Sequence, residues 1–121
     1  EAELAAPGEL GGAARHREVP AMALVHADAA AYFESAPRGA FDGFTLSNVL
    51  DGASAAYARR LCDAVRRAAA PGAVAVVRSF VEPTMPCAGN RAADDRSLLW
   101  GVVDVGPAAT LGSRIEAWNR R

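Results

Sequence analysis

Apolar positions along the chain gather in short runs, and polar stretches with helical character separate these runs. The runs cover residues 21–26 (AMALVH), 41–50 (FDGFTLSNVL), 73–81 (AVAVVRSFV) and 98–105 (LLWGVVDV). Apolar residues at successive rather than alternate positions are typical of strands that are buried on both faces. The pattern therefore predicts four strands, with central ones that are covered on both sides.

The stretches between the strands predict two helices. Asp28 stands where an N-cap belongs, ahead of residues 29–36, and Pro37 blocks further helix. Ser54 is placed to cap a longer helix that runs to about residue 70. Alternating strands and helices imply right-handed crossovers and a parallel sheet, so the fold class predicted is α/β.

The longer helix has an apolar stripe and a charged face. Its stripe consists of Tyr57, Leu61, Val65 and Ala68. The charged face carries Arg59, Arg60, Asp63, Arg66 and Arg67. Asp63 and Arg67 are spaced for an i,i+4 ion pair, and Pro71-Gly72 supplies a stop signal. We expect the stripe to face the sheet and the arginine face to be solvated or to contact an anionic lipid surface.

Length, charge and composition exclude several classes of protein. The 121 residues fit one domain, with residues 1–20 as an irregular or helical segment and residues 21–121 as the α/β unit. A net charge of −1 gives no electrostatic footprint for nucleic acid, and the absence of lysine excludes a P-loop or Schiff-base lysine. No run is long enough to cross a membrane, and the start lacks a signal-peptide pattern, so a cytoplasmic protein is expected.

Polar side chains stand where the predicted strands end. They are Asp28 after the first strand, Ser47, Asn48 and Asp51 after the second, and Arg78, Ser79 and Glu82 after the third. Ligands of open parallel sheets bind beyond the carboxyl ends of the strands. We therefore expect Asp28, Asn48 and Arg78 to converge on one cleft that suits a ligand with amine and carboxylate groups. Arg96, in a polar loop, is a further candidate for contacting a substrate.

These residues also have purely structural explanations. Asp28 can serve only as a helix cap, and the Ser47-Asn48 pair can satisfy backbone groups at a strand end. Arg78 can pair with a local carboxylate, Glu82 or Asp104. The histidines and cysteines match no spacing of metal ligands, so no metal is expected.

Two longer stretches carry a resemblance to a known family. Residues 26–51 (HADAAAYFESAPRGAFDGFTLSNVLD) and 68–80 (AAAPGAVAVVRSF) resemble the second half of a class I S-adenosylmethionine-dependent methyltransferase. FTLSNVLD, RSFVEP and DRSLLWGVV are similar to bacterial relatives of the aminocarboxypropyl transferases of betaine-lipid synthesis. The resemblance covers about residues 22–105.

The resemblance implies a Rossmann-like, three-layer α/β/α fold with a mostly parallel sheet. It implies S-adenosylmethionine as cofactor, with Asp28 and Ala29 at the adenine and Ser47 and Asn48 beside the methionine part. Asp51, Arg78 and Arg96 are then the candidates for a small-molecule or lipid substrate, with peripheral membrane contact. The first two strands of the family fold, with the G-x-G-x-G turn that follows the opening strand, are not found in this sequence, so the chain would be the C-terminal half of the domain.

A sheet that lacks two strands has unpaired backbone edges, and this leads to a second hypothesis. Such edges pair with another chain by strand addition. The alternative function is a non-catalytic interaction module that forms a homo-oligomer. The transferase hypothesis instead makes the chain part of a longer catalytic domain.

Overall fold

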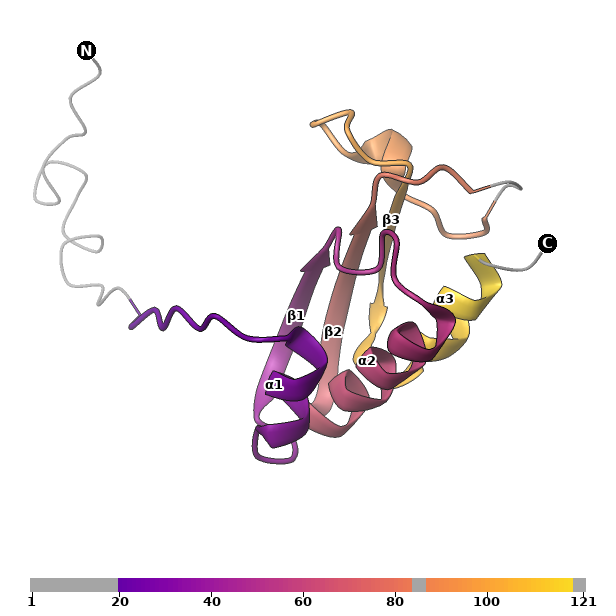
Figure 1. The fold of residues 1–121 in the computed structure, drawn as a ribbon. Coiled ribbons are helices and arrows are strands. Elements are labelled where there is room, and N and C mark those ends of the chain that lie inside the picture. The colour runs from indigo at the N-terminus through magenta and orange to yellow at the C-terminus, as the bar shows by residue number, and fades with distance from the viewer. Residues whose placement is uncertain (1–19, 84–86, 119–121) are drawn as a thin grey trace, which may run out of the picture.

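The computed structural model describes residues 20–83 and 87–118. The elements are α1 (Ala29–Ser35), β1 (Phe41–Ser47), α2 (Ala55–Ala68), β2 (Ala69–Ser79), β3 (Val102–Pro107) and α3 (Leu111–Trp118). Short 3-10 turns precede β3, at residues 92–94, and α3, at residues 108–110. Figure 1 shows the three helices side by side against one face of a three-stranded sheet.

The strands lie in the order β1-β2-β3, and the sheet is mixed. β1 and β2 are parallel, with Phe44 opposite Ala75 and Leu46 opposite Val77, which confirms the α/β class. β3 is antiparallel to β2, with Val76 opposite Val105. β3 returns antiparallel because a loop with one 3-10 turn, rather than a crossover helix, joins it to β2.

α2 passes directly into β2, and the predicted stop signal has a different role. The helix ends at Ala68 and the strand begins at Ala69. Phe41 lies opposite Ala69 but Gly43 lies opposite Val74, so β2 bulges between these pairs. The bulge contains Pro71 and Gly72, whose φ of 80° is favourable only for glycine. Pro71-Gly72 therefore shapes the strand and does not end the helix.

The core lies between the sheet and the helices. The α2 stripe is buried as predicted, because Leu61, Val65 and Ala68 have no exposed surface and Tyr57 packs partly buried against the core. Their partners on the other elements are Phe44, Leu46, Ala75, Val77, Leu111 and Ile115. Leu61 and Leu111 are among the largest fully buried side chains, so α2 and α3 share one core with the sheet.

Arg67 links α2 to α1, although the sequence predicted that it pairs with Asp63 within α2. Asp63 pairs with Arg66 at 3.1 Å rather than with Arg67. Arg67 instead donates hydrogen bonds to the carbonyl oxygens of Phe33, at 3.2 Å, and Ala36, at 2.6 Å. These carbonyls are at the C-terminal end of α1, where helix geometry leaves them without a partner. The Arg67 guanidinium therefore stabilises the fold more by binding these carbonyls than it would by pairing with the exposed carboxylate of Asp63.

The second face of the sheet is exposed over much of its area among the described residues, although Val103, opposite Arg78 on this face, is buried. Val74 and Val105 are 44% and 43% exposed, and Thr45 and Ser47 also lie on the surface. β1 and β2 therefore alternate between buried and more exposed positions, whereas the sequence predicted burial on both sides. In β3 the first three residues, 102–104, are all buried.

The predicted first strand does not form. Residues 20–27 form neither a strand nor a helix, and Figure 1 shows this segment leading away from the sheet. Met22 and Leu24 are 86% and 92% exposed. Apolar composition alone does not make a strand, because each strand needs a neighbour for its backbone hydrogen bonds. Of the predicted segment 1–20, only Pro20 lies within the described residues.

The other strand boundaries also shift. β1 ends at Ser47 rather than at Leu50, and the last strand is Val102–Pro107 rather than 98–105. Leu98 lies in the preceding loop, with a φ of 56° and 83% of its surface exposed. No helix among the described residues has both the length and the apolar character that crossing a membrane requires.

Candidate functional site

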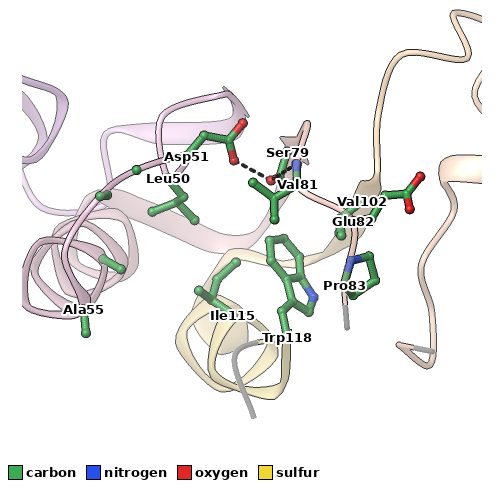
Figure 2. Close-up of a pocket in the computed structure, with 13 residues that line it drawn as sticks. Leu50, Asp51, Ala55, Ser79, Val81, Glu82, Pro83, Val102, Ile115 and Trp118 are labelled. Atoms are coloured by element: carbon green, nitrogen blue, oxygen red, sulfur yellow. Dashed lines mark hydrogen bonds between the residues drawn. The ribbon is translucent and has the colours of Figure 1, made fainter. Parts of the chain in front are cut away.

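A cavity of about 480 Å³ opens at the carboxyl ends of β1 and β2. The loops that follow the two strands form one side, and α3 contributes Ile115 and Trp118 on the other (Figure 2). Its volume is in the range of sites for small molecules. The cavity therefore lies where the sequence placed a ligand site, at the carboxyl end of the parallel pair.

Asp51 and Ser79 form the polar part of this cavity. The hydroxyl of Ser79 donates a hydrogen bond to Asp51 Oδ1, and the backbone N–H of Phe80 donates to Oδ2 at 3.0 Å. The Ser79 oxygen in turn accepts from the N–H of Val81 at 3.1 Å. These bonds hold the loop after β1 to the end of β2, as Figure 2 shows for Asp51 and Ser79. Asp51 is therefore fixed on the wall of the cavity, and its role as a substrate contact stays a prediction.

The local sequence explains how Asp51 reaches this position. The N–H of Ala53 donates to the carbonyl of Leu50 at 3.1 Å, which closes a tight turn around Asp51 and Gly52. Gly52 has a φ of 75°, a conformation in which other residues are strained. Ser54 then accepts from the N–H of Tyr57 and begins α2, as predicted. The Asp-Gly-x-Ser run thus turns the chain after β1 and begins α2.

Asp28 joins the first turns of two helices. Its carboxylate accepts hydrogen bonds from the N–H of Ala31, at 2.8 Å, and from the hydroxyl of Tyr57, at 2.7 Å. The Ala31 N–H and then the Tyr57 hydroxyl hold the pKa of Asp28 below its usual value, and Arg60, 3.8 Å away, also favours the charged form. The predicted N-cap is confirmed, and Ala29 packs against the core.

Ser47 and Asn48 end β1 with exposed side chains. Asn48 adopts a φ of 62°, and its N–H donates to the carbonyl of Arg78 at 2.9 Å. Asparagine tolerates this left-handed conformation better than most residues. The backbone of Asn48 thus continues the pairing of β1 with β2 beyond the end of the strand.

Arg78 pairs with a carboxylate that the sequence did not single out as its partner. Its Nε lies 3.6 Å from Asp95, and both side chains are partly buried. Hydrogen bonds from Ser97 and the nearby Arg78 charge lower the pKa of Asp95. Asp104, one of the predicted partners, instead binds Arg114 at 2.8 Å. Arg96 is exposed in the same loop as Asp95.

The structure does not gather all the predicted residues around this cavity. Asp51 lines it, as do Ser79 and Glu82, whereas Asp28, Ser47, Asn48, Arg78 and Arg96 do not. The sequence missed the contribution of α3, in which Leu111, Ile115 and Trp118 follow at helical spacing. That spacing is the signal that places Ile115 and Trp118 on one face.

The chain matches none of the protein-family models, curated proteins or solved structures with which it was compared. The described residues hold no cluster of three or more His, Cys, Asp or Glu side chains that could bind a metal ion. A fold class alone does not determine an activity. Function is therefore inferred from the chemistry of the site.

Proposed function

We propose that the chain is the C-terminal half of an S-adenosylmethionine-dependent transferase, which transfers a methyl or an aminocarboxypropyl group. The observation that carries this proposal is the cavity beside Asp51, at the carboxyl ends of a parallel strand pair joined by α2. This is the edge at which open α/β sheets bind their ligands.

The cofactor supplies an electrophilic carbon next to a cationic sulfur, so the leaving group needs little acid catalysis. The protein's contribution is then mainly to position the acceptor in line. Asp28 would accept a hydrogen bond from the adenine amino group, beside Ala29. Its carboxylate is exposed and held in the ionised form, and each oxygen still has room for a further donor.

The end of β1 would border the methionine part of the cofactor. Ser47 and Asn48 are exposed there, and Asn48 is held in position by its bond to the Arg78 carbonyl. The acceptor would lie in the adjacent cavity, against Asp51. Arg78 and Arg96 would contact the acceptor only at its outer end, because neither lines the cavity.

The full domain we propose is a three-layer, Rossmann-like fold. Val74 and Val105 are apolar side chains on an exposed sheet face, and a second helical layer would cover them. β1 has one neighbouring strand among the described residues, so two further strands would lie along its other side. These two features support a domain wider than the sheet described.

The proposal is tested by isothermal titration with S-adenosylmethionine and with S-adenosylhomocysteine at millimolar concentration. We expect saturable binding that Asn48→Gly weakens, because glycine keeps the left-handed backbone but removes the amide. Asp42→Ala, an exposed change at the other end of β1, is the matched control and should bind as the native chain does. Absence of heat with both ligands would refute the assignment.

One side of β1 has no neighbouring strand in the part of the chain that the structure describes, and this favours a second candidate function, an interaction module. An unpaired strand edge is a template for another strand, and the apolar segment 21–26 is exposed in the same chain. This candidate predicts a dimer or larger assembly that binds no nucleotide and that Leu24→Lys weakens. A monomer across a tenfold range of concentration, measured by light scattering, would contradict it.

A further inference from the structure

We propose that the cavity beside Asp51 binds a small amine, with its positively charged nitrogen against Asp51 and a compact apolar body against α3. The inference rests on the proposed function only in naming this amine as the acceptor substrate. The binding itself follows from the walls and the charge of the cavity.

The walls are mostly apolar and come from α2 and from four further places along the chain. Leu50 follows β1, Val81 follows β2, Val102 begins β3, and Ile115 and Trp118 come from α3. In Figure 2 the Trp118 indole stands between Ile115 and Pro83, on the side of the cavity away from Leu50. Such walls favour a ring or a short alkyl body, because burial of its surface is the main gain in a pocket of this kind.

The charge of the cavity is negative. Asp51 lines it together with the exposed Glu82, and none of the lining residues within 20–83 and 87–118 is an arginine. The two arginines nearest in the sheet and in α3, Arg78 and Arg114, have carboxylate partners of their own, as described above. A phosphate or carboxylate ligand would therefore meet repulsion without a compensating cation.

Asp51 is held in place but its charge is not neutralised. Its two oxygens accept from neutral donors, the Ser79 hydroxyl and the Phe80 N–H, and each keeps capacity for a further hydrogen bond. An ammonium group supplies both the donor and the opposite charge, which makes the stronger, charge-assisted bond.

The test uses three probes with the same body: 2-phenylethylamine, 2-phenylethanol and phenylacetate. Calorimetric titration of the chain, without S-adenosylmethionine, should show the amine binding at least tenfold more tightly than the alcohol, and no binding of phenylacetate. Equal affinity for amine and alcohol, preference for the carboxylate, or no binding of any probe at millimolar concentration would overturn the proposal.

Two neighbouring alanines of α2 provide a matched pair of variants. Ala55 lines the cavity, whereas Ala56 is exposed on the groove between α1 and α2. Ala55→Lys should weaken amine binding at least tenfold by placing a competing cation near Asp51, and Ala56→Lys should leave it within twofold. Equal losses in the two variants would show binding to overall surface charge, and would refute the site.

Asp51→Asn removes the negative charge at this position while keeping the shape of the side chain. The amide still accepts one of the two hydrogen bonds, and the variant should bind the amine no better than the alcohol. These titrations contain no cofactor, so their outcome is independent of the test with S-adenosylmethionine. Amine binding without cofactor binding would refute the transferase and keep the amine site.

Discussion

Gly101 is the position at which we expect one added methyl group to lower the free energy of unfolding most. It precedes β3, and its N–H donates to the carbonyl of Ser79 at 2.9 Å. A Cβ added there would lie 2.6 Å from the carbonyl oxygen of Val81 and 2.7 Å from the backbone nitrogen of Glu82. Non-bonded heavy atoms are at their optimum about 3.5–4.0 Å apart, so Gly101→Ala forces two backbone segments to separate.

Gly112 serves as the matched control for the loss of stability in Gly101→Ala. Overpacking of this kind costs about 3 kcal/mol when the neighbours cannot move aside, and here the neighbours are backbone atoms. At Gly112, inside α3, an added Cβ would meet only Cys62 Cβ at 3.7 Å, an ordinary contact. Gly112→Ala should therefore be neutral or gain up to about 1 kcal/mol from helix propensity. We expect the two variants to differ by about 3–4 kcal/mol.

Urea unfolding followed by far-ultraviolet circular dichroism measures this difference. With a slope of about 2 kcal/mol per molar urea, Gly101→Ala should lower the midpoint by about 1.5 M, at unchanged slope. It should also weaken amine binding, because Val81 and Glu82 line the cavity. If the urea midpoint of Gly101→Ala lies within about 0.3 M of that of Gly112→Ala, the backbone at Gly101 is not in close contact with that of Val81 and Glu82.

Three further predictions follow from side chains whose partners are defined. Arg67→Met removes two hydrogen bonds to carbonyls at the end of α1 and should lower the free energy of unfolding in urea by about 2 kcal/mol. Arg66→Met loses one exposed ion pair and should lower it by less than about 0.5 kcal/mol. Equal losses in the two variants would be inconsistent with the structure. Because hydrogen bonds lower the pKa of Asp28 in the folded state, its contribution to stability is complete above the unfolded value and is lost as the pH falls through the lower, folded pKa. Asp28→Asn keeps a capping oxygen without the charge, so its stability should fall less steeply than that of the native chain below pH 3.8, and parallel acid titrations would argue against this role. Burial raises the pKa of the Cys62 thiol, so iodoacetamide should label Cys62 slowly until urea unfolds the chain. Mass spectrometry of the peptide that contains Cys62 measures the labelling. Rapid labelling of the folded chain would place Cys62 at the surface.

Features that depend on short-range chemistry were predictable from the sequence. The caps at Asp28 and Ser54 were predicted, because a side-chain oxygen three residues before an N–H defines them locally. The buried stripe through Leu61 and Val65 followed from helical spacing, and the parallel pairing of β1 with β2 followed from the helix between them.

Features that depend on distant partners were not predictable in this way. The antiparallel direction of β3 reflects the loop that replaces a crossover, and apolar composition does not distinguish the two directions. Arg67 binds carbonyls more than thirty residues away, although a carboxylate stands at the ideal local spacing. Asp51 was a candidate, but the wall that Trp118 adds to its cavity depends on where α3 packs.

The continuous passage from Ala68 to Ala69 has a mechanical consequence for the cavity. No loop separates α2 from β2, so the two elements are directly coupled, and Ala55 and Ser79 on the cavity wall belong to one element each. α3 is anchored to the sheet by the bond from Arg114 to Asp104. Accommodation of ligands of different size should thus come from a swing of the Trp118 end of α3 about that anchor, while the Asp51 side keeps its geometry.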